Sequence, residues 1–361
     1  MAKPVIHHRT PQFSSLFADA RLGLQRLFQT KQDVLVLAAS GTGAMEAAIT
    51  NCFAIGDEVV VVNGGKFGER WYKLSQTFGL KPIEIRVEWG RAVRPDQIAE
   101  ALRAHPQAKG VLVQASETST TSLHPVRELA ELTRGRDVLL VVDGITAVGV
   151  YDVPMDDWGI DVLITGSQKA LMLPPGLAFI ALSEKAWGQV RPKDGRRFYF
   201  DLVRERDNQS KNTTAWTPAI SLVYGLHEAL AMLLEEGLPE VFARHDRLAR
   251  ATRAAAQALG LRLVAPDSPS PSATGLFVPE AVDGGKLVAY LRDRMQVTFA
   301  GGQDQLKGRI VRLAHLGYVG AFDVVVGIAA LEMALSHFGH SLEFGRGVAA
   351  AQEVLMAALP A

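Results

Sequence analysis

The sequence has very little cysteine and no excess of either charge. Its 361 residues include one cysteine, Cys52, which excludes a disulfide framework and a CxxC pair that could bind a metal or carry redox chemistry. The 38 Lys and Arg residues balance the 38 Asp and Glu residues, and this neutrality disfavours a nucleic-acid-binding protein, which would usually be basic. The scarcity of cysteine suits a reducing compartment.

Long apolar runs are also missing. The longest runs, such as Val34–Ala39 and Val138–Val142, have the length of a strand, far short of the roughly 20 residues that a membrane-spanning helix needs. The first ten residues contain no apolar core of signal-peptide length, and the last three are not a peroxisomal signal of the Ser-Lys-Leu type. We therefore expect a soluble, cytoplasmic protein with no nucleic-acid or membrane partner. Its length indicates about two domains.

The first two thirds of the chain alternate between short apolar runs and amphipathic stretches. Several runs consist almost entirely of Val, Leu and Ile, which is typical of strands covered on both faces. Stretches with helical spacing, such as Pro95–Ala104 and Pro125–Thr133, lie between them. This order predicts an α/β fold with a mainly parallel sheet and right-handed crossovers. The predicted strands are Val34–Ala39, Glu58–Val62, Ile83–Val87, Val111–Ala115, Val138–Val142, Val162–Thr165 and Leu177–Leu182.

The remaining third has a different pattern. Residues 188–218 are polar and irregular, and two long helices are predicted after them, Ser221–Glu236 and Pro239–Leu259. We expect a large domain over residues 1–240 and a smaller α+β domain over residues 241–361. The smaller domain should hold strands near Thr274–Val278 and Arg309–Leu313, and helices near Lys286–Arg294, Phe322–His337 and Val348–Leu359.

A turn rich in small residues, Ser40-Gly-Thr-Gly-Ala-Met-Glu46, joins the first predicted strand to a helix. Small residues let the backbone approach an anion, and the helix N-terminus offers free N–H groups and partial positive charge. The turn is not a P-loop, because no Gly-Lys-Ser/Thr follows, and a dinucleotide fingerprint fails at Glu46. On its own the turn is a weak signal, because many α/β turns carry glycine for steric reasons.

Two charged side chains follow neighbouring strands. Asp143 ends the run Val138–Val142, and Lys169 follows the run Val162–Thr165, so both should lie at the carboxyl edge of the sheet, where ligands of open α/β sheets bind. Taken singly, the aspartate could cap a turn and the lysine could be a solvated charge. Together with the phosphate turn, they match the needs of pyridoxal phosphate, which takes a lysine amine for a Schiff base and an acid at its ring nitrogen.

Four motifs together resemble the class V aminotransferases. They are Ser-Gly-Thr-Gly-Ala-Met-Glu-Ala47, Glu-Thr-Ser-Thr120, Val-Val-Asp143 and Gly-Ser-Gln-Lys-Ala-Leu171. The chain looks most like the alanine/serine–glyoxylate branch, which also contains proteins labelled as soluble hydrogenase small subunits. The resemblance implies a fold-type I pyridoxal-phosphate enzyme with a mainly parallel seven-stranded sheet and a small C-terminal α+β domain. It also implies a homodimer with its active site at the subunit interface.

The resemblance assigns a role to each matching residue. Lys169 would form the Schiff base and carry the proton, and Asp143 would pair with the ring nitrogen. Phe67 would stack on the ring, the alternative being a core aromatic. The other residues implied in cofactor binding are Ser40, Gly41 and Thr42 at the phosphate, Gln168 near it, and Thr118 at the ring hydroxyl or the Schiff base.

Two further residues are implied outside these motifs. Arg312 matches the family arginine that binds the substrate carboxylate, for which a planar guanidinium is well suited. Arg309 is the competing candidate, although alternation along a strand puts it on the opposite face. Thr217 resembles the segment that family dimers lend to the phosphate site of the neighbouring subunit, and it is otherwise a plain helix start.

The sequence departs from the family at two places. A Pro-Gly-Pro segment that usually lies about 20 residues before the region of His8 is not found, which bears on substrate binding. Thr121-Ser122 stands where Thr-Gly is common, and the change requires that this residue not adopt positive φ. Cys52 would suit a cysteine desulfurase only if exposed, and its apolar surroundings predict burial.

The expected activity is transfer of an amino group from alanine or serine to an α-keto acid such as glyoxylate or pyruvate. A lyase or another aminotransferase of the same fold remains open, because reaction choice depends on which Cα bond lies perpendicular to the cofactor ring. A non-catalytic subunit of a larger complex, such as a soluble hydrogenase, is the alternative from another class.

Overall fold

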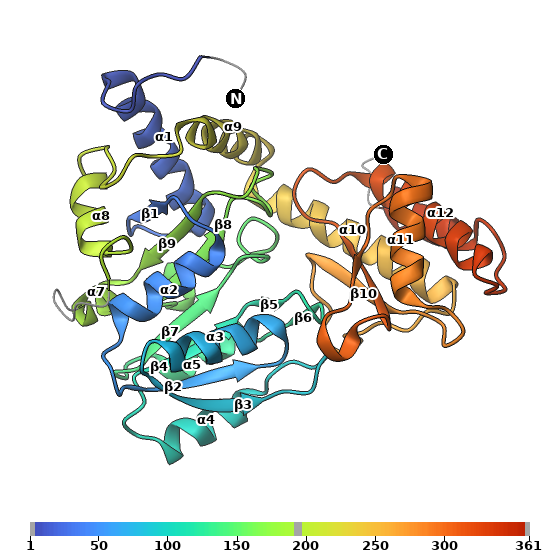
Figure 1. Cartoon of the computed structure of the whole chain (residues 1–361), viewed down its shortest axis with the longest axis horizontal. Coiled ribbons are helices and arrows are strands. Elements are labelled where there is room, and N and C mark those ends of the chain that lie inside the picture. The colour runs from blue at the N-terminus through green and yellow to red at the C-terminus, as the bar shows by residue number, and fades with distance from the viewer. Residues whose placement is uncertain (1–3, 191–196, 358–361) are drawn as a thin grey trace.

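The computed structural model describes residues 4–190 and 197–357 and contains a seven-stranded sheet (Figure 1). The strand order is β1-β9-β8-β7-β4-β2-β3. Strand β9 runs antiparallel to both neighbours, and the other pairs are parallel, which confirms the predicted mainly parallel seven-stranded sheet. The strands are β1 (Val34–Leu37), β2 (Glu58–Asn63), β3 (Lys81–Arg86), β4 (Gly110–Gln114), β7 (Leu139–Asp143), β8 (Val162–Gly166) and β9 (Ala178–Leu182).

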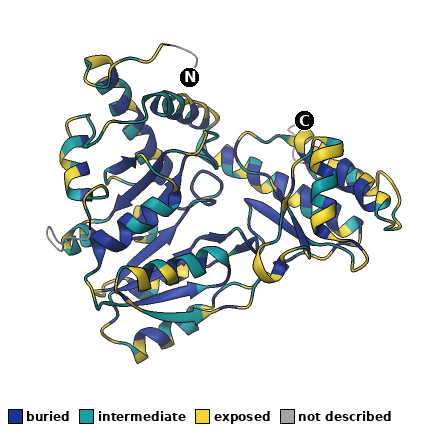
Figure 2. Ribbon diagram, viewed as in Figure 1, coloured by how far each residue is buried: buried dark blue, intermediate teal, exposed yellow. Residues whose placement is uncertain are grey.

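Apart from the edge strand β3, whose residues are only partly buried or exposed, the strands of this sheet are largely buried because helices cover both of its faces (Figure 2). Successive residues alternate between two cores, so that Val60 and Val62 belong to one and Val59 and Val61 to the other. This double burial explains why the strands are nearly continuous in Val, Leu and Ile. One face packs against α1 (Pro11–Phe28), α4 (Pro95–Ala104), α5 (Val126–Thr133), α6 (Met155–Trp158) and α9 (Ile220–Glu236); the other packs against α2 (Gly41–Cys52), α3 (Lys66–Thr77), α7 (Glu184–Gln189) and α8 (Leu202–Gln209).

Among the described residues, four helices, α1, α6, α7 and α8, lie where the sequence predicted none, and α1 and α8 are the longest of them. Helix α1 has Thr10 as its N-cap, whose side chain accepts the N–H of Phe13, and Pro11 in its first turn. Helix α8 interrupts the segment that was expected to be irregular, and Asp201 caps it. Both caps are signals present in the sequence. Residues 191–196 of that segment lie outside the described residues.

A second, three-stranded antiparallel sheet follows, in the order β10-β12-β11. It has its own core, to which Leu276, Val311 and Leu331 contribute. The predicted boundary at residue 240 falls in the first turn of α10 and stays a prediction, and residues 358–359 of the last predicted helix lie outside the described part. The elements are β10 (Ala273–Phe277), β11 (Ala300–Gly301), β12 (Ile310–Ala314), α10 (Leu238–Ala258), α11 (Gly284–Met295), α12 (Ala321–His337) and α13 (Arg346–Met356).

Short elements connect the two sheets. Strands β5 (Ser116–Glu117) and β6 (Ser122–Leu123) form a small hairpin after β4, and Leu123 donates its N–H to the carbonyl of Ser268 in the segment before β10. The carboxyl ends of the central strands and the small sheet therefore meet at this hairpin (Figure 1). None of the helices in the described ranges has the length and apolar character needed to cross a membrane.

Candidate active site

The carboxyl ends of β1, β4, β7 and β8 surround a cavity of about 300 Å³. Because parallel strands end at the same edge of a sheet, segments far apart in the sequence meet there. Eight of the residues predicted from the sequence line this cavity: Ser40, Gly41, Thr42, Phe67, Thr118, Asp143, Gln168 and Lys169.

The turn after β1 leaves free N–H groups at the cavity. Ser40 is the N-cap of α2, but its side chain makes no capping hydrogen bond. In the described part of the chain, the N–H groups of Gly41 and Thr42 have no acceptor, whereas those of Gly43 and Ala44 donate to the Ser40 carbonyl. These free donors, at the positive end of a helix of 12 residues, form an anion-binding geometry.

A residue that the sequence reading missed, Arg70, adds a cation to this turn. Its Nη1 donates to Thr42 Oγ1 at 3.0 Å, and its Cζ lies 4.9 Å from the centroid of the Phe67 ring. Phe67 lines the cavity and is absent from the described hydrophobic cores, against the alternative of a core aromatic. The signal for Arg70 was its position three residues after Phe67, which places both on one helical face.

Asp143 is the buried last residue of β7, and its Oδ1 accepts the N–H of Ile145 at 2.9 Å. Burial raises the pKa of this carboxyl to about 7, and the hydrogen bond from Ile145 opposes the rise. The nearby carboxylate of Glu117 raises the pKa further. A cationic ring nitrogen bound beside Asp143 would favour its ionised form.

The raised pKa of Asp143 predicts a pH-dependent stability of the cofactor-free protein. The unfolded aspartate ionises near 3.8 and the folded one near 7, so unfolding releases a proton between these values. Stability from this group is therefore present at low pH and lost as pH rises, by up to about 1.4 kcal/mol per unit. In denaturant titrations from pH 5 to 8, the free energy of unfolding of Asp143→Asn should rise relative to that of the wild type up to about pH 7 and then stay level. A constant difference would contradict the raised pKa.

Lys169 lines the cavity from the loop after β8, whereas Arg312 lies near Lys169 on β12 but is not among the residues that line the cavity. Burial lowers the pKa of the Lys169 amine, the positive charge of Arg312 lowers it further, and Asp143 opposes the shift. Arg312, on β12 of the small sheet, donates from Nη1 to the carbonyl of Thr118 at 2.7 Å and from Nε to that of Gly301 at 3.1 Å. The competing candidate, Arg309, precedes β12 and is exposed.

Two predicted features lie away from the cavity. Thr217 is exposed and precedes α9, and it does not line the cavity. Cys52 is buried at the end of α2, as expected, and burial raises the pKa of its thiol to about 12, which disfavours a reactive thiolate. Within residues 4–190 and 197–357, no group of three or more His, Cys, Asp or Glu side chains could hold a metal ion.

The residue of the β5–β6 hairpin that adopts positive φ is Thr121. Ser122, the position at which the sequence analysis required that φ not be positive, is the next residue. Thr121 has φ 58°, whereas Ser122 begins β6. A β-branched residue in this left-handed region is strained. Thr121 Oγ1 accepts the N–H of Gly275 in β10 at 3.1 Å, and its carbonyl accepts that of Ser270 at 2.9 Å. Contacts with the small sheet therefore hold the strained turn.

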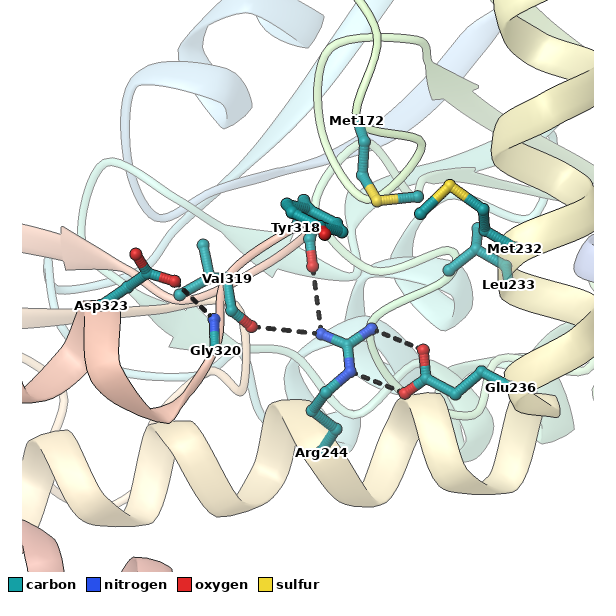
Figure 3. Close-up of a pocket in the computed structure, with 10 residues that line it drawn as sticks. Met172, Met232, Leu233, Glu236, Arg244, Tyr318, Val319, Gly320 and Asp323 are labelled. Atoms are coloured by element: carbon teal, nitrogen blue, oxygen red, sulfur yellow. Dashed lines mark hydrogen bonds and ion pairs between the residues drawn. The ribbon is translucent and has the colours of Figure 1, made fainter.

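A second cavity, of about 360 Å³, lies between α9, α10 and the loop after β12 (Figure 3). Arg244 of α10 is among the residues that line it. The guanidinium forms two bonds with the carboxylate of Glu236, at 2.6 and 3.0 Å, and Nη1 donates to the carbonyls of Gly317 and Val319. Gly317 in turn lies close to the Lys169 backbone, since a Cβ added there would be 3.0 Å from the Lys169 carbonyl. Arg244 thus fixes the loop that lies behind Lys169.

Replacing Arg244 should lower the free energy of unfolding of the protein. Arg244→Ala leaves the Gly317 and Val319 carbonyls without their donor, at a cost of about 1–3 kcal/mol in the free energy of unfolding. Glu236→Gln, which leaves the guanidinium in place, should cost less than Arg244→Ala. Denaturant unfolding of the two variants measures the difference, and equal losses would show that the carbonyl bonds contribute nothing.

The comparisons with known proteins agree with this geometry. A profile described as aminotransferase class V matches residues 2–314. The chain belongs to the aminotransferase class V family. A relative from Methylorubrum extorquens named serine–glyoxylate aminotransferase is 36% identical, covering 96% of this chain and 90% of its own length. One from Synechococcus sp. named soluble hydrogenase, small subunit, is 42% identical, covering 99% and 94%.

Solved structures extend the similarity to the whole fold. The class V chain matches the crystal structure of ureidoglycine–glyoxylate aminotransferase from Bacillus subtilis with a TM-score of 0.94 and 29% identity, covering 98% of this chain and 93% of the other. The expected class V resemblance and fold-type I architecture are therefore confirmed, and the family implies pyridoxal phosphate as cofactor.

The residues at the cavity fit this cofactor. The free N–H groups of the α2 turn suit its phosphate, and the buried acid of Asp143 suits its ring nitrogen. Gln168 Oε1, which is buried and has no hydrogen-bond partner in the described part of the chain, is a further polar atom available to a ligand.

Proposed function

We propose that this chain is a pyridoxal-phosphate-dependent aminotransferase that moves an amino group from alanine or serine to an α-keto acid such as glyoxylate or pyruvate. The observation that carries the proposal is that Lys169, Asp143 and the Ser40–Thr42 turn line the same cavity. An amine, an acid and an anion site are the three groups that the cofactor needs. A cytoplasmic location accompanies the proposal, supported by the single cysteine.

In this proposal the cofactor supplies an aldehyde that joins an amine and a ring that accepts electrons from the substrate Cα. Lys169 would hold the cofactor covalently and would then accept and return the proton at the substrate Cα. Its lowered pKa favours the neutral amine that can accept a proton. Asp143 would hold a proton at the ring nitrogen, and Phe67 would pack against the ring. Thr118, which bonds Thr146 through its hydroxyl at 2.8 Å and lines the cavity, would help to orient the cofactor.

Recognition of the substrate is assigned to Arg312. Its guanidinium is held by the carbonyls of Thr118 and Gly301, which fix its plane without neutralising its charge. A carboxylate could bind this planar group through two parallel hydrogen bonds. Both the amino acid and the keto acid carry such a carboxylate, so one arginine serves both half-reactions. The choice of small substrates is supported by the glyoxylate aminotransferases among the relatives.

The activity can be tested one half-reaction at a time. Alanine or serine added alone to the pyridoxal-phosphate-loaded protein should convert its visible absorbance to that of the amine form, and glyoxylate or pyruvate should restore it. A screen of amino acids against both keto acids then ranks the substrates. Release of pyruvate from serine without any keto acid would indicate a lyase. Absence of any spectral change with every amino acid tested would overturn the aminotransferase proposal.

A homodimer that shares the active site is part of the proposal. Its support is an exposed aromatic cluster beside Thr217: Phe198 is 71% and Tyr199 44% exposed, and both rings pack on Trp216. Apolar rings left in water favour coverage by another surface. Sedimentation velocity should give twice the 39.0 kDa of one chain. Thr217→Ala should weaken pyridoxal-phosphate binding without dissociating the dimer.

A role as a non-catalytic subunit is the second candidate, and the name of the Synechococcus relative favours it. The intact Lys169 and Asp143 pair weighs against it, since a buried acid whose pKa is raised serves no evident folding purpose. Purified protein that is colourless and retains no pyridoxal phosphate after the unbound cofactor has been removed would support the subunit role.

A further inference from the structure

A buried carboxylate, Glu117, lies directly beside the cavity without lining it. Glu117 ends β5 and has no exposed surface. Its Oε2 accepts the N–H groups of Phe67 at 3.1 Å and Gly68 at 3.0 Å. Its Oε1 accepts the N–H of Ser119 at 3.1 Å and the Ser119 hydroxyl. A fully buried carboxylate with four donors is a built feature of the protein, since burying a charge without such partners is costly.

These bonds cap helix α3 from another element. The N-cap of α3 is Gly65, which has no side chain with which to cap it. Glu117 satisfies two N–H groups of the first turn, and Ser119 Oγ accepts the N–H of Lys66 at 2.9 Å. A Cβ on Gly65 would lie 2.6 Å from Glu117 Cγ and Cδ, so the glycine is what lets the carboxylate reach the helix.

The hydrogen-bond pattern favours the ionised form of Glu117. All four of its bonding groups are donors, which an ionised carboxylate accepts and a protonated one matches less well, because it brings a fifth donor. Burial raises the pKa of Glu117, whereas the hydrogen bonds oppose the rise. The positive end of α3 stabilises the charge further.

The capped helix and the residue after Glu117 both contribute to the cavity. Helix α3 carries Phe67 and Arg70, and Arg70 donates to Thr42 in the phosphate turn. Thr118 follows Glu117 directly, and its carbonyl accepts Arg312. One buried side chain thus connects the aromatic wall, the phosphate turn and the arginine of the small sheet.

We propose that Glu117 is a positioning residue: its carboxylate caps α3 and thereby sets Phe67 and Arg70 against the ring and phosphate of the cofactor. This inference rests on the proposed function for its cofactor, but the cap itself is a property of this chain alone. Glu117 does not touch the reacting atoms and acts through the residues it holds.

The variant Glu117→Gln tests this role. The amide has nearly the same shape, but it turns one acceptor into a donor that faces N–H groups or the Ser119 hydroxyl. We expect pyridoxal phosphate, titrated into the cofactor-free protein and followed by absorbance, to bind about 10- to 100-fold more weakly. The visible circular dichroism of the bound cofactor should also decrease, because it reports how the ring is held. Glu117→Asp keeps the charge but draws it back from the helix, and should give an intermediate loss.

The matched control is Glu69→Gln, the same chemical change on the same helix. The Glu69 side chain forms partly exposed ion pairs with Lys66 and Lys73, so pyridoxal-phosphate affinity should stay within about twofold. The inference is overturned if Glu117→Gln and Glu117→Asp both bind the cofactor as the wild type does and with the same dichroism.

Hydrogen exchange separates this inference from the proposed function. In the cofactor-free protein, the amides of Phe67 and Gly68 should exchange at least about tenfold faster in Glu117→Gln than in Glu69→Gln. Unchanged exchange would refute the cap whatever the protein binds. Faster exchange in a protein whose wild type never takes up pyridoxal phosphate would sustain the cap and refute the proposed function instead.

Discussion

The variant Lys169→Ala is expected to lose both the visible imine absorbance with pyridoxal phosphate and at least about 10³-fold of transamination. Lys169 is the lysine that lines the cavity together with Asp143. Burial and the charge of Arg312 lower the pKa of its amine, which favours the neutral form that attacks an aldehyde. Without this amine, the protein lacks both the nucleophile for the covalent bond and the base that would accept the proton from the substrate Cα.

The control for this prediction is Lys73→Ala. Lys73 lies on α3 with its side chain 64% exposed and pairs with Glu69, so its removal should leave absorbance and rate within about twofold. Cofactor affinity should also be compared, because the α2 turn and Asp143 remain in Lys169→Ala and should still hold the phosphate and ring. If Lys169→Ala kept full activity and imine absorbance, the assignment would be wrong.

Replacing Arg312 is expected to produce the second largest effect, on the substrate rather than the cofactor. Arg312→Ala removes the guanidinium that is assigned to the substrate carboxylate, so kcat/KM should fall by about 10²- to 10³-fold, mostly through KM. Arg312→Lys keeps the charge but not the planar pair of donors, and should recover only part of the loss. The affinity for pyridoxal phosphate should stay within about threefold, because Arg312 lies outside the residues lining the cavity.

Arg309→Ala provides the matched control. Arg309 lies three residues before Arg312 and is exposed, so its loss should change kcat/KM by less than about twofold. Steady-state kinetics with varied amino acid and fixed keto acid would distinguish the two arginines. A large loss in Arg309→Ala beside normal kinetics in Arg312→Ala would exchange their roles.

The sequence predicted the sheet and much of the cavity because both depend on periodic patterns. Strands buried on both faces are recognisable as apolar runs, and parallel strands bring their carboxyl ends to one edge. Asp143 and Lys169 could therefore be placed together without coordinates. Helix α1 was not predicted, although its cap, Thr10 followed by Pro11, is visible in the sequence, because the helix precedes the first strand and lies outside the strand-helix alternation.

Residues that act through contacts across the fold were harder to find. Arg70 and Glu117 each touch the site through partners distant in sequence, Thr42 and the start of α3, and no local spacing reveals such pairs. The positive φ of Thr121, in place of the residue after it, likewise depends on hydrogen bonds to the small sheet. These are tertiary effects that override the local preference of the chain.

The central claim is that Lys169 is joined covalently to pyridoxal phosphate. Borohydride reduction of the loaded protein, followed by proteolysis and mass spectrometry, tests it most directly. The account predicts one phosphopyridoxyl group per chain, on the peptide that contains Lys169. Labelling of a different lysine, or no labelling of a protein that is nevertheless active, would contradict it.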